Sequence, residues 1–395
     1  MINFELRNMP DFFFGKGMER RCGELLREFG GSRVLIHHSG EAFVRPLIEL
    51  LKKDIERAGL TTIELGGVVP NPRLSKIYEG IELGKREKID CVLAVGGGSV
   101  IDSAKGIAMG CAYDGDVWDF YCQKAVPERM LVLGVVSTFA GTGSESSRAS
   151  VVTNDKTQLK RSADDFDLMR PDFAILNPEL TQSIPPFQTA SGAADIFSHL
   201  CENYFSATKD IYLSRQLLTA GMKTVLKNAP AAVRDPDNYA ARSALMMTAP
   251  LAVNGIMRLG LVGDWACHLI EHEMSTEWDI PHGAGLAVIT PCWMEYVYRR
   301  DVELFARFAV EAFNCEYDFD NPEWTAREGI RKVRGFFRDL GLPGRIQEFA
   351  GEVSSGTLKK LAARIPYDKN GDKWEIGCTF HLEEKDVYEI YKMAL

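Results

Sequence analysis

The chain has 395 residues, of which 46% are hydrophobic and 26% are charged, the profile of a soluble globular protein. At this length we expect two domains rather than one. The formal net charge is -9 at pH 7, and because an acidic surface repels phosphate backbones, a nucleic-acid partner is not expected.

Neither a membrane segment nor a secretory signal is expected. No run approaches the roughly 18 uninterrupted apolar residues of a membrane-spanning helix. The first residues, MINFELRNMP, have no basic start and no long apolar stretch. The nine cysteines are scattered and form no CxxC pair. This favours a reducing compartment, so we expect a cytoplasmic protein without a thiolate zinc site.

The first half of the chain alternates strand-like and helix-like segments. Apolar runs predict strands at 33–38, 61–67, 90–95, 130–138 and 172–180. Apolar residues at helical spacing predict helices at 40–59, 71–88 and 99–110. Segment 90–95 does not alternate, which is typical of a parallel strand buried on both faces. The alternation of strands and helices predicts βαβ units and a doubly wound parallel sheet.

After residue 183 the pattern becomes helical throughout. Pro185 and Pro186 can open a helix, and the segments that follow keep a helical period. We therefore predict an α/β dinucleotide-binding domain over residues 1–183 and an all-helical domain over residues 184–395. A cleft between two such domains is a common place for a ligand site.

Three loops follow predicted strands: PNP (70–72), GGGS (96–99) and STFAGTGSE (137–145). The carboxyl ends of parallel strands meet at one edge of a sheet, where open sheets bind ligands. Glycines let the backbone approach a ligand closely, and a helix start favours a phosphate. GGGSVIDSAKG is not the G-x-G-x-x-G fingerprint and could be a tight turn only. The three loops together predict a dinucleotide site.

Three of the seven histidines, His268, His272 and His282, lie within fifteen residues. His268 and His272 are four residues apart, as are Asp195 and His199, so each pair projects from one helix face. Carboxylate and imidazole ligands suit iron(II) or zinc, and the lack of thiolates fits a reactive site. One such pair is often only a local hydrogen bond. Two pairs and a further histidine favour a metal site.

These motifs occur together, in this order, with FGKG at 14–17 and PHGAG around His282. Over nearly its whole length the chain resembles the iron-containing (group III) alcohol dehydrogenases, and in particular their butanol dehydrogenase branch. The resemblance implies the dehydroquinate synthase-like fold, with an α/β dinucleotide-binding domain and a helical domain. It also implies a metal-dependent alcohol dehydrogenase or aldehyde reductase that forms a homodimer or a higher homo-oligomer.

The resemblance further implies site residues. The metal, with iron(II) favoured and zinc possible, would be held by Asp195, His199, His268 and His282. His272 would lie beside the substrate as a proton carrier. The implied cofactor contacts are Asn71, Gly97, Gly98, Ser99, Asp102, Thr138, Thr142 and Lys160.

Cofactor choice depends on the residue that follows the first predicted strand. Members that prefer NAD often carry an acidic residue there, which binds the ribose hydroxyls and repels a 2′-phosphate. Ser39 occupies this position here, and His37 or His38 could contact a 2′-phosphate. We therefore expect NADP(H) to be favoured over NAD(H), although the nearby Glu41 keeps NAD(H) open.

Three alternatives stay open. A zinc-dependent polyol dehydrogenase of the glycerol type, or a dehydroquinate-synthase-like lyase, resembles the chain around GGGS but usually lacks the full Asp-His-His-His set. A metallohydrolase could use Glu271 or Glu273 as a general base, but it gives no reason for three strand-end loops. A non-catalytic nucleotide sensor would not need the metal ligands.

Overall fold

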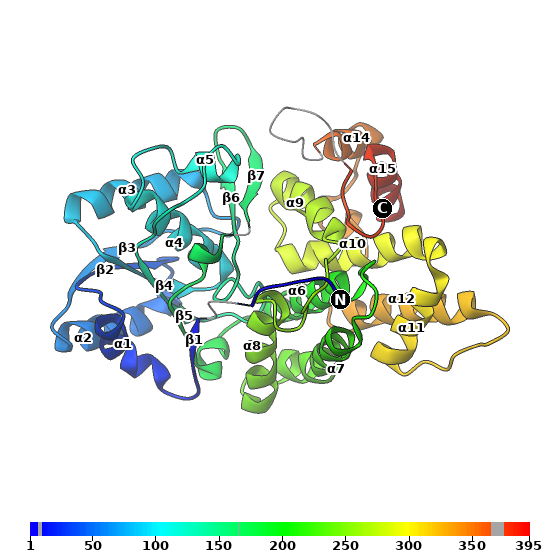
Figure 1. Ribbon diagram of the computed structural model, residues 1–395, viewed down its shortest axis with the longest axis horizontal. Helices are drawn as coiled ribbons and strands as arrows, with labels where there is room; N and C mark the ends of the chain where they lie inside the picture. Colours follow the sequence, from blue (N-terminus) through cyan, green and yellow to red (C-terminus); the bar gives the residue numbers. More distant parts are fainter. Residues whose placement is uncertain (7–9, 165, 365–374) are drawn as a thin grey trace. The chain divides into compact units, whose positions relative to one another are not determined.

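The structure is a computed structural model that describes residues 1–6, 10–164, 166–364 and 375–395. It divides into two compact units. The first, here called the α/β unit, comprises residues 7–183. The second, here called the helical unit, comprises residues 184–395 together with residues 1–6. Figure 1 shows strands flanked by helices in the first unit and a group of helices in the second.

A six-stranded sheet forms the centre of the α/β unit, in the order β1-β8-β5-β4-β2-β3. All neighbouring strands in it are parallel, which confirms the predicted parallel sheet. β1, β6 and β7 were not predicted from the sequence. β6 and β7 form a separate antiparallel pair. The strands are β1 (Asp11–Phe14), β2 (Arg33–His38), β3 (Thr61–Leu65), β4 (Cys91–Gly96), β5 (Val132–Ser137), β6 (Ser150–Asn154), β7 (Leu159–Ala163) and β8 (Phe173–Leu176).

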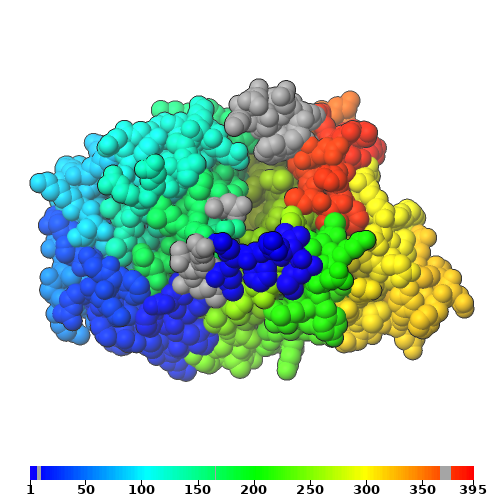
Figure 2. Space-filling model, viewed as in Figure 1, coloured from blue at the N-terminus to red at the C-terminus, as the bar shows by residue number. Residues whose placement is uncertain are grey.

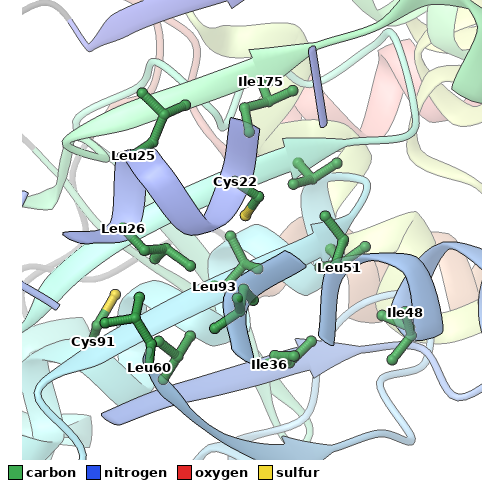
Figure 3. Packing of buried hydrophobic residues seen from close by; sticks show 14 of the residues in the cluster. Cys22, Leu25, Leu26, Ile36, Ile48, Leu51, Leu60, Cys91, Leu93 and Ile175 are labelled. Atoms are coloured by element: carbon green, nitrogen blue, oxygen red, sulfur yellow. The ribbon is translucent and has the colours of Figure 1, made fainter. Parts of the chain in front are cut away.

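Helices cover the sheet of the α/β unit. They are η1 (Met18–Arg21), α1 (Cys22–Glu28), η2 (Ala42–Val44), α2 (Arg45–Arg57), α3 (Leu74–Glu87), α4 (Gly98–Cys111), α5 (Trp118–Tyr121), η3 (Asp167–Met169) and η4 (Pro178–Thr181). α1 and α2 pack on one face, where Leu26 and Leu51 meet Ile36 and Leu93 of the central strands (Figure 3). Each such fully buried side chain contributes roughly 1.5–3 kcal/mol.

Strand β2, between β4 and β3 in the sheet, is buried on both faces. Val34 and Ile36 belong to the core under α1 and α2. Because successive side chains point to opposite faces, Leu35 and His37 face the other side, and Nε2 of His37 lies 2.9 Å from the Ser103 hydroxyl in α4. The β2 side chains on both faces of the sheet are therefore either apolar or hydrogen-bonded. For this reason the β2 sequence does not alternate between apolar and polar residues.

The helical unit is built from α6 (Pro186–Tyr204), α7 (Tyr212–Arg234), α8 (Tyr239–Val253), α9 (Ala266–Trp278), α10 (His282–Val297), η5 (Tyr298–Arg300), α11 (Val302–Phe313), α12 (Pro322–Asp339), α13 (Gln347–Ala350), α14 (Ser355–Ala363) and α15 (Glu384–Met393). An isolated bridge joins Ile376 to Leu382. The predicted helical character is confirmed. α6 begins at the second proline of the predicted pair and is buried from Thr189 to Tyr204, so it is the central helix of this unit.

Residues 1–6 belong to the helical unit, although the sequence analysis counted them with the first domain. The amino group of Met1 donates to the Lys209 carbonyl at 2.5 Å, and the Ile2 N–H donates to the Gly260 carbonyl at 2.9 Å. Figure 2 shows this segment, in dark blue, on the outside of the unit. Backbone hydrogen bonds hold it there, and they leave no signal in the side-chain pattern.

Two further observations concern the cysteines and the membrane. In the described ranges, each of the nine cysteines is a free thiol. Most of them are buried, where a thiol packs as a small apolar group. Among the helices that the structure describes, none is both long and apolar enough to cross a membrane.

Candidate metal centre and cofactor loops

The central helix α6 carries the first two predicted ligands. Asp195 and His199 are one helical turn apart, and both side chains are buried. Nε2 of His199 lies 3.5 Å from Oδ1 of Asp195. The i,i+4 spacing therefore places them on one face, as the sequence predicts.

Two further histidines approach the same carboxylate oxygen from α9 and α10. Nε2 of His268 lies 3.7 Å from Oδ1 of Asp195, and Nε2 of His282 lies 3.9 Å from it. His282 is the first residue of α10. The rings of His199 and His268 stack with centroids 4.6 Å apart. All four predicted ligands are thus brought to one point in the helical unit.

This donor set fits a divalent cation. One donor atom each from Asp195, His268 and His282 lie within 4.8 Å of one another. Oδ1 of Asp195 and Nε2 of His268 are buried and have no hydrogen-bond partner within the described part of the chain. Leaving a buried polar atom unpaired costs about 1–3 kcal/mol, which a bound cation would offset. One carboxylate and several imidazoles suit iron(II) or zinc.

The electrostatics of the site favour an ionised carboxylate. Burial alone would raise the pKa of Asp195, but the three imidazoles hold it well below its usual range. Burial lowers the pKa of His199 to about 3, although Asp195 opposes this shift. Burial also lowers the pKa of His268, but the carboxylates of Glu202 and Asp195 outweigh it and raise this pKa to about 10.

Two buried glutamates contact the candidate ligands His268 and His282 on the side away from Asp195. Oε2 of Glu202 contacts Nδ1 of His268, and Oε2 of Glu271 contacts Nδ1 of His282. Glu202 was not predicted as a site residue, although its position seven residues after Asp195 places it on the same face of α6. Glu271, considered above as a hydrolase base, is fully buried and bonded in this way, so it does not face water.

His272 differs in its surroundings from the candidate ligands His268 and His282. It lies one turn after His268 on α9 and is partly exposed. Its ring centroid lies 5.4 Å from that of His282. His272 is therefore next to the candidate centre but is not part of the group of donor atoms that surrounds Asp195.

In the α/β unit, two of the predicted cofactor loops meet at the carboxyl ends of β4 and β5. The Thr138 N–H donates to the Gly96 carbonyl at 3.1 Å. A Cβ atom on Gly98 would lie 2.5 Å from Oγ1 of Thr142, so only glycine permits this approach. Gly97 precedes α4, and Ser99 lies in its first turn. The first turn of this helix offers N–H groups to a phosphate.

The third loop is joined to the β6–β7 pair. Nζ of Lys160, in β7, donates to Oδ1 of Asn71 at 3.0 Å. The Thr153 N–H in β6 donates to the Pro72 carbonyl at 2.9 Å. This pair, which the sequence analysis missed, brings Lys160 to the PNP loop.

Asp102, one of the predicted cofactor contacts, also holds neighbouring segments of the chain together. Its Oδ1 accepts a 2.5 Å hydrogen bond from the Ser144 hydroxyl, and its Oδ2 accepts a 3.0 Å bond from the Val151 N–H. The buried ammonium of Lys105 donates to the same Ser144 hydroxyl and, at 2.7 Å, to the Ala149 carbonyl. α4 therefore fixes the segment that follows the AGTGSE loop.

The suggestion that His37 or His38 contacts the cofactor is not supported. Both side chains are fully buried. Nδ1 of His37 lies 3.1 Å from the Leu65 carbonyl, and Nε2 of His38 lies 3.2 Å from Glu64. Ser39, in contrast, follows β2 and is partly exposed.

Comparison with known proteins identifies the family. The model of "Iron-containing alcohol dehydrogenase" matches residues 10–178, and the model of the "Fe-containing alcohol dehydrogenase family, C-terminal" matches residues 189–395. The chain belongs to the iron-containing alcohol dehydrogenase family. It is accordingly a metal-dependent oxidoreductase that acts on alcohols or aldehydes.

Individual relatives match along the whole chain. NADH-dependent butanol dehydrogenase A of Clostridium acetobutylicum is 36% identical, with 100% of both chains covered. NADPH-dependent aldehyde reductase YqhD of Escherichia coli is 30% identical over 91% of this chain and 93% of its own. The crystal structure of NADH-dependent butanol dehydrogenase A from Thermotoga maritima is 34% identical and has a TM-score of 0.93, with 100% of this chain and 99% of that chain covered. The sequence-based family assignment is confirmed.

Proposed function

We propose that the chain interconverts a short or medium-chain primary alcohol and its aldehyde, with a nicotinamide cofactor and one divalent metal ion. The observation that carries this proposal is the convergence of His199, His268 and His282 on one oxygen of Asp195. Butanol is the first substrate to test, because the names of several relatives specify butanol dehydrogenase.

The metal would be held by Asp195, His199, His268 and His282. When bound, such an ion polarises an alcohol or carbonyl oxygen and lowers the pKa of the alcohol. We propose iron(II), with zinc as the alternative, because oxygen and nitrogen donors accept both. Burial of Asp195, His199 and His268 excludes water from the ligand side chains.

His272 is proposed to carry the proton. It lies beside His282 and is partly exposed, so its ring can exchange a proton with solvent while His199 and His268 are buried. An imidazole titrates near neutral pH, which suits a group that both takes up and releases a proton.

The dinucleotide is proposed to bind the loops of the α/β unit. Its phosphates would meet the first turn of α4 at Gly98 and Ser99, with Lys160 held near by Asn71. Gly97, Thr138 and Thr142 shape the same edge, and Asp102 supports it. When bound, the nicotinamide ring accepts or supplies the hydride.

We propose NADP(H) as the preferred cofactor, on the basis of Ser39. The backbone of Ser39 accepts a 3.0 Å hydrogen bond from Gly67, and a Cβ atom on Gly67 would lie 3.2 Å from Nζ of Lys76. A 2′-phosphate beside Ser39 would therefore lie near the ammonium of Lys76, which also pairs with Glu79 at 2.6 Å. The names of four relatives at 36–37% identity specify NADH and count against this proposal, with Glu41 as the candidate carboxylate.

A reconstitution assay tests both parts. The protein is purified without oxygen, stripped of metal and supplied with iron(II) or zinc, and butanal-dependent oxidation of NADPH and NADH is followed. Metal-dependent oxidation that is faster with NADPH supports the reaction and the cofactor choice. Faster oxidation of NADH overturns the cofactor choice alone. No oxidation of either cofactor with either metal overturns butanal as substrate.

A cytoplasmic location and a homodimer or higher homo-oligomer remain proposals. The free thiols support a reducing compartment. The oligomeric state rests on the family resemblance. Analytical ultracentrifugation of the metal-loaded protein tests it, and a monomer at micromolar concentration would contradict it.

A further inference from the structure

We propose that Glu202 and Glu271 are positioning residues that hold His268 and His282 with their Nε2 atoms aimed at the metal. This inference rests on the proposed function, because it takes a metal ion at Asp195 as given. Each histidine has the same arrangement: Nδ1 contacts a glutamate, and Nε2 of the same ring faces Oδ1 of Asp195.

The chemistry of the imidazole ring explains why this arrangement matters. A neutral ring carries one N–H and one nitrogen lone pair. When Nδ1–H is donated to a carboxylate, the lone pair is fixed on Nε2, the atom that would bind the metal. The carboxylate also fixes the ring's orientation and makes the other nitrogen a better donor.

Glu202 is itself rigidly held. Its side chain is 0% exposed. Its Oε1 accepts the N–H groups of Cys267 at 2.7 Å and His268 at 3.4 Å, in the first turn of α9. A carboxylate at a helix start is favoured by the helix dipole. Glu202 therefore fixes both the ring of His268 and the backbone that carries it, from the same helix as Asp195.

Glu271 is held differently. Its side chain is also 0% exposed, and its Oε1 accepts from the hydroxyl of Ser275, one turn later on α9. A Cβ atom on Gly285 would lie 2.4 Å from Oε1. Gly285, in the PHGAG motif, thus leaves room for the Glu271 carboxylate next to His282.

His199 lacks this support. Among the described residues, its buried Nδ1 atom has no hydrogen-bond partner. The chain therefore holds two of the three proposed imidazole ligands by a carboxylate at Nδ1, whereas the ring of His199 packs against the rings of His268 and Trp265.

The two glutamates differ in how they should respond to glutamine. At position 202 both carboxylate oxygens accept hydrogen bonds from N–H groups. The NH₂ group of a glutamine there must therefore point at one of these N–H groups. At 271 one partner is the Ser275 hydroxyl, which can also accept. Glutamine at 271 can therefore accept from Nδ1 of His282 and donate to Ser275, which keeps the ring in place.

The experiment measures metal affinity rather than turnover. Metal-stripped full-length protein is titrated with Zn²⁺ and with Co²⁺ against a chelator, for the wild type and for Glu271→Ala, Glu271→Gln and Glu202→Gln. The visible spectrum of the Co²⁺ form reports the ligand geometry. Glu311→Gln is the matched control, because Glu311, on α11, accepts a 2.7 Å bond from the Tyr204 hydroxyl of α6 rather than from a histidine.

We expect Glu271→Ala and Glu202→Gln to weaken metal binding by about 10–100-fold. Glu271→Gln should lose less affinity and keep the wild-type Co²⁺ spectrum, and Glu311→Gln should bind as the wild type does. Equal affinities for the wild type, Glu271→Ala and Glu202→Gln would overturn the inference. If Glu202→Gln does not fold, the comparison of alanine with glutamine at 271 decides. A wild type that binds no metal would instead overturn the proposed function.

Discussion

Nε2 of His268 lies 3.7 Å from Oδ1 of Asp195, and neither buried atom has a hydrogen-bond partner among the residues that the structure describes. A buried carboxylate oxygen and a buried imidazole nitrogen that lack hydrogen-bond partners are a pair of donors that a divalent cation could satisfy together. The arrangement therefore predicts that loss of either side chain removes the metal.

His268→Ala should abolish metal binding and lower alcohol oxidation by at least about 100-fold, because the metal supplies several kcal/mol at the transition state. Metal content per chain and kcat are measured on the same preparation. Retention of one metal ion per chain by this variant would contradict the ligand assignment.

His272→Ala should separate proton transfer from metal binding. We expect one bound metal ion per chain, as in the wild type, and a kcat lowered by roughly 100-fold or more, the usual effect of losing a proton-transfer group. The pH profile of kcat should also lose the limb that His272 provides. If this variant loses its metal, the role assigned to His272 is wrong.

Ser39→Asp should change the cofactor preference. A carboxylate beside a 2′-phosphate is repulsive, so KM for NADPH should rise by about tenfold or more while KM for NADH changes little. Ser39→Asn, which has the same shape without the charge, is the control. Equal effects of Asp and Asn on NADPH would show that the 2′-phosphate does not lie at this position.

Lys105→Met should weaken cofactor binding without affecting the metal. The ammonium of Lys105 donates to Ser144 and Ala149, and each buried acceptor left unpaired costs about 1–3 kcal/mol. We expect Kd for NADPH, measured by fluorescence titration, to rise by about tenfold and metal affinity to stay unchanged. Lys85→Met, at an exposed lysine, is the control. An unchanged Kd for NADPH would contradict the idea that Lys105 of α4 positions the AGTGSE loop (140–145).

Asp264 should make stability depend on pH. Its carboxylate accepts the N–H groups of Thr379 and Phe380, but burial outweighs these bonds and raises its pKa from 3.8 to about 6. Since the folded-state pKa is the higher one, its stabilising contribution is full below about pH 4 and is lost as the pH rises through 6.

The matched comparison uses Asp264→Asn, whose side chain stays uncharged. For metal-free protein, the unfolding free energy of the wild type minus that of the variant should fall between pH 4.5 and pH 7.5, by about 3 kcal/mol at most. Parallel pH curves for the two proteins would show that Asp264 does not titrate in this range.

The sequence predicted the features that depend on local pattern. Apolar runs identified β2, β4 and β5, and the four-residue spacing of Asp195 and His199 placed both on one helix face. It missed β1 and β6, which are short apolar runs, and β7, whose residues LKRSA are mostly polar. The contact of Glu202 with His268 joins residues 66 positions apart, so only the packing of α9 on α6 reveals it.

The most direct test of the account is the metal content of the protein after reconstitution. Metal-stripped wild type and Asp195→Ala are dialysed against iron(II) without oxygen, and bound metal per chain is measured together with butanal reduction. We predict one ion per chain and restored activity for the wild type, and neither for the variant. Activity of the metal-free wild type, or one bound ion and full activity in Asp195→Ala, would contradict it.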